Sequence, residues 1–202
     1  MGMQITVMFS VGFFVPITQL YLIDEGVDKS NSGYWYSSET AAYMVVSIFL
    51  AKVSSKLNKP KQMLFGNFMM VAAFLLLGPS PWFFKKSLWL TFLGLILIGV
   101  ACAFLYIPSM PHMIEVAQGE YGFGKDDRLN DVISGITNVS LCLGEFFGPL
   151  AASALYEPLG FRLATTIIAI FIFVYGLVYL RFCDFKTSLI NDQNEDSELV
   201  LM

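Results

Sequence analysis

Residues 87–114 read SLWLTFLGLILIGVACAFLYIPSMPHMI and contain no Asp, Glu, Lys or Arg. An α-helix that crosses a bilayer needs about 20 mainly apolar residues, so this stretch is long enough to span the membrane once. Because the segment is continuously apolar and does not alternate between polar and apolar residues, it favours a helix over a strand of a membrane barrel. The stretch therefore predicts an all-α membrane protein.

Similar stretches lie on both sides of this segment. Three of them carry no charge, and two carry one acidic residue each, Glu39 and Glu145. The predicted spans cover residues 3–23, 33–51, 62–80, 88–110, 132–155 and 162–181. We thus expect six transmembrane helices that form one bundle over residues 1–183. A disordered acidic cytosolic tail is expected over residues 184–202.

The composition excludes most other classes of protein. Hydrophobic residues make up 56% of the 202 residues and charged residues only 14%, whereas an average soluble domain has roughly 25% charged residues. The net charge of −4 gives no reason to expect a nucleic-acid partner. The single His and three scattered Cys residues predict no metal site, no cofactor and no enzymatic activity.

The distribution of Lys and Arg predicts how the chain is oriented in the bilayer. Eight of the 12 basic residues fall on the side that includes loop 52–61 and both chain ends, and four fall on the other side. Since cytosolic loops carry an excess of Lys and Arg, we expect both termini in the cytosol. Trp35, Trp82 and Trp89 lie near span ends on the opposite side, where an aromatic belt at the membrane interface is expected in preference to a ligand-binding role.

The fifth predicted span carries a polar stripe. Asp131, Asn138 and Glu145 are seven residues apart, which is nearly two helical turns, so they share one face at intervals of about 10 Å. Glu145 falls near the middle of the span, where an ionisable group usually has a function. A proton and a cation would compete for its carboxylate, which is the basis of exchange. The alternative is a buried, protonated Glu145 that is hydrogen-bonded to a neighbouring helix.

Small residues follow a second face of the same span at intervals of four. Residues of this size let two membrane helices approach closely, so this face is expected to pack. It lies about 100° around the helix from Glu145 at mid-span. The helix-packing residues are predicted to be Ser140, Gly144, Gly148 and Ala152.

Two other polar side chains are candidates for the lining of a shared cavity. Glu39 lies near the non-cytosolic end of the second span, and Tyr106 lies in the fourth. Together with Glu145 and Asn138 they form the predicted site for protons and substrate. Ordinary hydrogen bonding between helices remains the alternative for Tyr106, and an interfacial position remains the alternative for Glu39.

Three segments resemble a known family. Residues 136–149, ITNVSLCLGEFFGP, resemble helix eleven of the vesicular amine transporters, which belong to the major facilitator superfamily. Residues 109–113, SMPHM, resemble the end of helix ten of that family, and loop 51–61 resembles the basic loop between helices eight and nine of major facilitators. The resemblance covers most of residues 5–182. It implies the C-terminal six helices of a twelve-helix transporter, closest to the vesicular polyamine transporter branch.

The resemblance also implies an activity. Members of the family exchange lumenal protons for a cytosolic organic cation, and the first, second, fourth and fifth spans here correspond to helices that line the cavity. Monoamine and acetylcholine transporters have acidic residues where this chain has Asn138 and Tyr106, whereas this chain has Glu145 instead. We therefore expect a polyamine-type substrate, proton-coupled antiport and a location in a cytoplasmic vesicle membrane of the secretory or synaptic type. An N-terminal half or a second bundle is needed to complete the cavity.

Two alternatives remain open at this stage. The chain could belong to a facilitator of another small solute, such as a drug or a sugar. An organic anion fits less well because no Lys or Arg lies in the middle of a predicted span. The other alternative is a truncated, non-transporting isoform that associates with a full-length partner.

Overall fold

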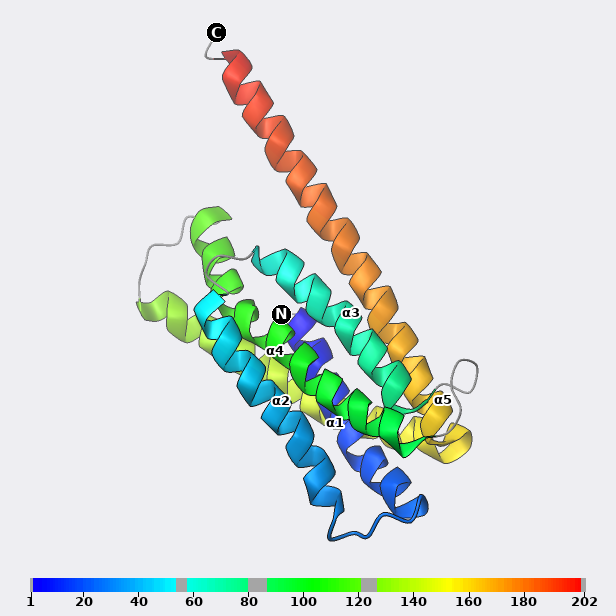
Figure 1. Cartoon of the computed structure of the whole chain (residues 1–202). Helices are drawn as coiled ribbons and strands as arrows, with labels where there is room; N and C mark the ends of the chain where they lie inside the picture. The colour runs from blue at the N-terminus through cyan, green and yellow to red at the C-terminus, as the bar shows by residue number, and fades with distance from the viewer. Residues whose placement is uncertain (1, 54–57, 80–86, 121–126, 201–202) are drawn as a thin grey trace.

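The computed structural model describes residues 2–53, 58–79, 87–120 and 127–200, with side chains described over 2–53, 58–79, 87–119 and 128–181. These parts are helical, and no strand occurs in them (Figure 1). The helices are α1 (Gly2–Asp24), α2 (Ser32–Val53), α3 (Lys59–Leu77), α4 (Leu88–Glu120) and α5 (Asp127–Val200). The all-α expectation is therefore confirmed for the described residues, but the expected number of six helices is not, because the structure gives five.

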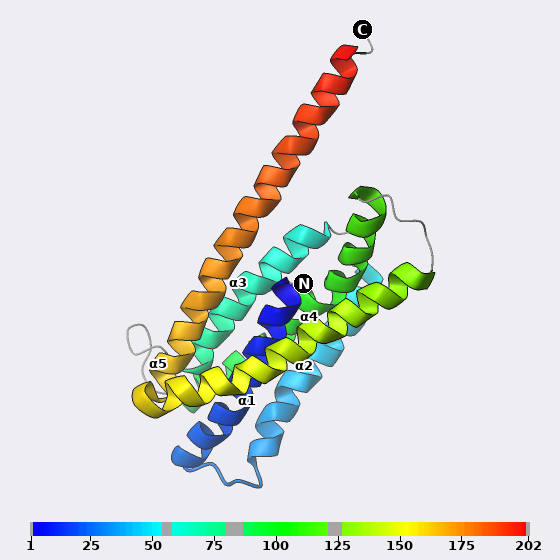
Figure 2. The same cartoon turned by 180° about the vertical axis from the view of Figure 1, so that it is seen from behind.

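The difference in number arises at Gly160 in α5. Gly160 has φ 72° and ψ 170°, which is not helical, and the chain reverses there (Figures 1 and 2). We call residues 127–159 the first arm of α5 and residues 161–200 the second arm. The predicted spans 132–155 and 162–181 lie on either side of Gly160, so both are parts of the single element α5. A straight helix of 74 residues would be about 110 Å long, far more than the bilayer core of about 30 Å.

A substitution at Gly160 should show how far the reversal depends on glycine. Its backbone conformation is almost restricted to glycine, so Gly160→Ala should destabilise the bundle by about 1–3 kcal/mol. Gly135→Ala is the matched control, because Gly135 is helical on the first arm and a Cβ there has no neighbour within 4 Å. Thermal unfolding in detergent, followed by circular dichroism, should show a lower midpoint for Gly160→Ala alone. Equal midpoints for the two variants would contradict a reversal that depends on glycine.

Four of the described helical segments are long and apolar enough to cross a membrane: Gly2–Asp24, Lys59–Leu77, Leu88–Gly119 and Arg128–Arg181, the last of which contains the Gly160 reversal. Helix α2, which covers the predicted span 33–51, is not among them. Its sequence contains Glu39 together with several Ser, Thr and Tyr residues, which lower its hydropathy.

Helix α4 continues farther than the sequence predicted. The span was expected over residues 88–110, but the helix runs to Glu120 through Pro108 and Pro111. Proline is tolerated inside membrane helices because neighbouring groups can satisfy the backbone carbonyls that it frees. The predicted disordered tail, 184–202, lies outside the residues whose side chains are described, and it stays a prediction.

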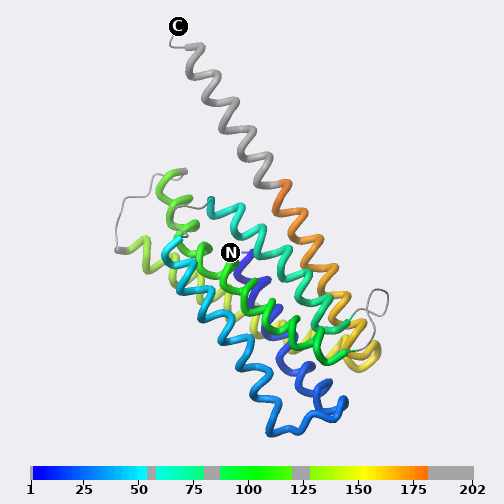
Figure 3. The backbone as a smooth tube through the Cα atoms, viewed as in Figure 1, coloured from blue at the N-terminus to red at the C-terminus, as the bar shows by residue number. Residues whose placement is uncertain are grey.

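The core lies where α1 and α3 pack against α4 and the two arms of α5 (Figure 3). Phe13 and Phe14 of α1 are fully buried, and both rings contact Phe74 of α3 at centroid distances of 6.3 and 6.5 Å. Asn67 of α3 donates a hydrogen bond of 3.1 Å to the carbonyl of Ile172 in the second arm. Helix α2 instead packs mainly on α4 and buries only two residues, so it leaves most of its surface open.

Candidate functional site

Glu39 and Tyr106 line the same pocket, which lies between α1, α2 and α4. Helices α2 and α4 approach closely here because Gly99 of α4 has no side chain, and a Cβ at this position would overlap the carbonyl oxygen of Glu39. The pocket has a volume of about 330 Å³. Its lining consists of Val7, Met8 and Val11 from α1, Glu39, Thr40 and Tyr43 from α2, and Cys102 and Tyr106 from α4.

The pocket combines one carboxyl group with hydroxyl groups and an apolar wall. Glu39 is half-buried, and no Lys, Arg or His lines the pocket. The ion pair of Lys59 with Glu115 involves neither Glu39 nor Tyr106. The arrangement therefore suits a cation or a proton, whereas an anion would meet a carboxylate with no basic group beside it.

The sequence analysis missed the apolar wall from α1 and three further residues of the pocket: Thr40, Tyr43 and Cys102. Helical spacing could have predicted Tyr43 and Cys102, since Tyr43 follows Glu39 by four residues and Cys102 precedes Tyr106 by four. Residues four apart lie on the same face of a helix. The sequence does not show that these two faces meet, because that depends on the contact of Gly99 with α2.

Glu145 and Asn138 lie elsewhere, on an exposed face of the first arm of α5. Both side chains are exposed, as is Asp131, the third residue of the predicted stripe. Large apolar side chains share this exposed surface, among them Val139, Leu143, Phe146 and Leu150. The structure thus places Glu145 neither in the core nor in the pocket with Glu39.

The small residues of the first arm face α1. Ser140, Gly144, Gly148 and Ala152 are all buried. A Cβ at Gly144 would lie 2.6 Å from the backbone nitrogen of Phe9, and one at Gly148 would lie 2.7 Å from the carbonyl oxygen of Phe9. The backbones of α1 and α5 therefore touch along this face, whereas the side chains of the polar stripe are exposed.

The two pairs of predicted site residues lie apart. Met8 lines the pocket that contains Glu39, and its Cβ also lies next to Gly144 of the first arm. Seen from behind, the first arm of α5 crosses α1 (Figure 2), whereas α2 packs mainly on α4. Glu39 and Tyr106 are thus brought together in the pocket, whereas Glu145 and Asn138 lie on the arm that packs on a neighbouring face of α1.

A buried polar cluster near the start of α1 was also missed. The amide nitrogen of Gln4 donates hydrogen bonds to the hydroxyl oxygens of Ser109 in α4, at 2.9 Å, and Thr137 in α5, at 3.4 Å. Gln4 is almost completely buried, so these bonds compensate for the loss of hydration of its amide nitrogen. The cluster ties together α1, α4 and α5, and the last two of these helices carry Tyr106, Asn138 and Glu145.

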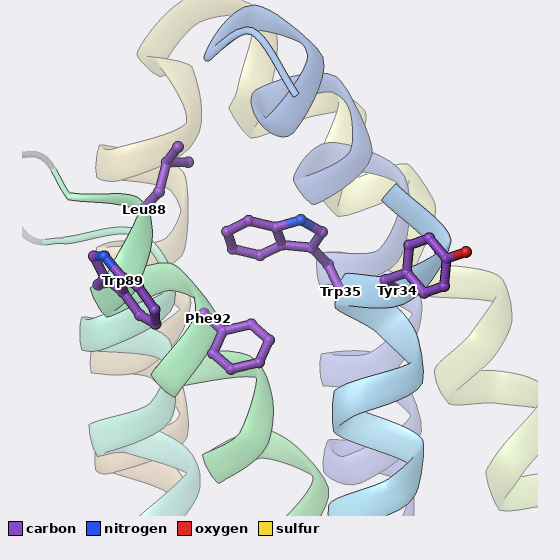
Figure 4. Close-up of a pocket in the computed structure, with 5 residues that line it drawn as sticks. All are labelled: Tyr34, Trp35, Leu88, Trp89 and Phe92. Atoms are coloured by element: carbon purple, nitrogen blue, oxygen red, sulfur yellow. The ribbon is translucent and has the colours of Figure 1, made fainter. Parts of the chain in front are cut away.

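A second pocket, of about 420 Å³, lies between the beginnings of α2 and α4 and is lined by Tyr34, Trp35, Leu88, Trp89 and Phe92 (Figure 4). The rings of Trp35 and Trp89 stand nearly perpendicular to Phe92, at centroid distances of 5.5 and 6.4 Å. Two of the three Trp residues predicted for the aromatic belt thus lie close together, whereas Trp82 is outside the described residues. The lining has no charged side chain.

Comparisons with known proteins give a family and three relatives. The sequence profile described as Major Facilitator Superfamily matches residues 1–201. Proteins named MFS-type transporter SLC18B1 are similar to the chain, with 28% identity over 170 residues in Homo sapiens, 27% over 177 in Rattus norvegicus and 27% over 172 in Mus musculus. The alignments cover 82%, 85% and 82% of this chain but only 37%, 38% and 37% of the relatives, so the chain spans less than two fifths of their length.

Proposed function

The chain belongs to the major facilitator superfamily, and we propose that it forms the C-terminal half of a transporter that exchanges protons for an organic cation. The match to this family and the similarity to SLC18B1 proteins confirm the resemblance found in residues 51–61, 109–113 and 136–149. Membership also makes the chain an integral membrane protein of a family that transports solutes. The substrate, the exchanged ion and the organelle are parts of the proposal.

The observation that carries the proposal is the exposed carboxyl group of Glu145. An ionisable side chain that faces lipid in the middle of a span is costly, so such groups usually face a cavity or the interior of a bundle. An adjacent face of the same arm is already packed against α1 through Gly144 and Gly148. We therefore propose that a second bundle covers the face of Glu145 and encloses a water-filled cavity, with Asn138 as a neutral hydrogen-bonding group.

Competition for one carboxylate would couple the two ligands. The deprotonated Glu145 attracts an ammonium group that enters from the cytosol, and a lumenal proton neutralises the carboxylate and releases the amine. Rocking of the two halves around a central site would expose it to each side in turn. No covalent chemistry is required, and the chain's own residues only bind, orient and release the proton and the amine.

The charge pattern favours an amine with several positive charges. Glu39 and Glu145 lie on two different helices, and neither predicted span contains Lys or Arg at mid-depth. A polyamine can use both acids, whereas a monoamine can use only one at a time. The excess of Lys and Arg lies on the side of the membrane that includes loop 52–61 and both chain ends, which supports cytosolic termini. The resemblance to vesicular amine transporters supports a location in a vesicle membrane.

Reconstitution tests this function. Radiolabelled polyamine uptake into acidified proteoliposomes should be measured with this chain alone and with a twelve-helix version that adds an N-terminal half. We expect uptake that depends on the pH gradient from the twelve-helix version and background uptake from the chain alone. Uptake of a drug or sugar in place of any amine would overturn the proposed substrate class.

One observation favours a second candidate function. The chain matches less than two fifths of its relatives and exposes the face of Glu145, so it could occupy the place of a C-terminal half as a non-transporting partner. In that case the chain would co-purify with a full-length transporter and lower its flux in the same proteoliposomes.

A further inference from the structure

We infer that the pocket containing Glu39 binds an ammonium group of the substrate, at a site separate from Glu145. This inference rests on the proposed function and adds a second cation site to it. Helices α1, α2 and α4 all contribute to the pocket. Its residues lie within this chain alone, so the pocket exists without a second bundle, unlike a cavity at Glu145.

The lining determines the chemical class of the ligand. Glu39 supplies a carboxylate, Thr40 supplies a hydroxyl group, and the phenol groups of Tyr43 and Tyr106 can accept hydrogen bonds from an ammonium group. Aromatic rings next to a carboxylate also attract a cation through their π faces. The apolar wall of Val7, Met8 and Val11 suits the methylene groups that adjoin a primary amine.

The volume and the shape of the pocket agree with this ligand. Small-molecule pockets in proteins typically measure roughly 300–1,000 Å³, and this one measures about 330 Å³. It is therefore large enough to hold the aminoalkyl end of an amine. Helix α1 lines this pocket with Val7, Met8 and Val11 and also packs on the first arm of α5, so the pocket is distinct from the exposed side chain of Glu145.

Cys102 provides a direct report on the occupancy of the pocket. Its side chain lines the pocket, while Cys142 is exposed on the first arm of α5. In a variant with Cys142→Ser and Cys183→Ser, Cys102 is the remaining thiol. A methanethiosulfonate reagent forms a mixed disulfide with the thiolate and releases methanesulfinate, so the rate of labelling measures access to Cys102.

The experiment compares a reagent that has an ammonium group with a neutral reagent of similar size. Because the carboxylate of Glu39 attracts only the first, the ratio of their rates should fall about tenfold in Glu39→Gln. Asp131→Asn is the matched control and should leave the ratio unchanged, because Asp131 is exposed near the beginning of the first arm of α5 and does not line the pocket. A diamine should slow labelling of Cys102 in the parent protein, and a sugar should not.

Three results would overturn the inference. The ratio of rates could be the same in the parent protein and in the Glu39→Gln variant, the diamine could fail to protect Cys102, or neither reagent could react with Cys102. The protection measurement needs no substitution at position 39, so it decides the question even where Glu39→Gln does not fold. Labelling is also independent of flux. Protection of Cys102 without transport would support this site and reject the exchange function. Transport without protection of Cys102 would support the exchange function and reject this site.

Discussion

Gly148→Leu is expected to prevent the bundle from folding to a stable, monodisperse protein. A Cβ at this position would lie 2.7 Å from the carbonyl oxygen of Phe9 and 2.8 and 2.9 Å from the carbonyl carbon and Cα of Gly12. All three are backbone atoms, so no rotation of a side chain can relieve the overlap. Inserting a large side chain into a packed interface costs about 1–3 kcal/mol, and a backbone clash should place this variant at the upper end of that range or above it.

Size-exclusion chromatography and thermal unfolding in detergent measure this effect. Gly135→Leu is the matched control, because it adds the same side chain to the same arm where a Cβ has no neighbour within 4 Å. We expect aggregation or a much lower unfolding midpoint for Gly148→Leu and a profile close to that of the parent protein for Gly135→Leu. If both variants behave like the parent protein, α1 and the first arm of α5 do not pack as described.

Glu145→Gln should abolish uptake driven by a pH gradient in the twelve-helix version. The substitution preserves the size of the side chain and removes the charge that protons and amines would compete for. Because the side chain of Glu145 is exposed, the variant should fold normally. Radiolabelled polyamine uptake into acidified proteoliposomes measures the loss, and the thermal unfolding midpoint verifies the fold.

Asp131→Asn is the control for this substitution. Asp131 belongs to the same exposed stripe but lies near the beginning of the first arm. It should retain pH-driven uptake, since a carboxylate at the end of a span is accessible to water without any cavity. Equal loss of uptake in both variants would indicate a general effect of charge on this face and would remove the special role of Glu145.

The sequence predicted the helices better than their connections. Apolar length predicted helical segments because a bilayer requires continuous helix, but the number of six helices was not confirmed. The spans 132–155 and 162–181 were expected as separate helices, and the structure joins them within α5 at the non-helical Gly160. Helix α4 was expected to end near Pro108 and Pro111, and it continues because proline bends membrane helices without always ending them.

The two faces of the first arm also follow from the sequence, whereas the grouping of the site residues does not. Helical periodicity separates Glu145 from Gly144 by about 100°, and the structure places the first on the surface and the second against α1. By contrast, the meeting of Glu39 with Tyr106 depends on the close contact of α2 and α4 at Gly99. Such a contact between distant segments leaves no local periodic signal in the sequence.

Proton release from acid-loaded proteoliposomes tests the central claim most directly. The twelve-helix version is reconstituted with a pH-sensitive dye inside, the membrane potential is clamped, and polyamine is added outside. The account predicts a rise in lumenal pH that saturates with amine concentration and is absent in Glu145→Gln. Entry of the amine at full rate with no change in lumenal pH would contradict proton exchange at this carboxylate.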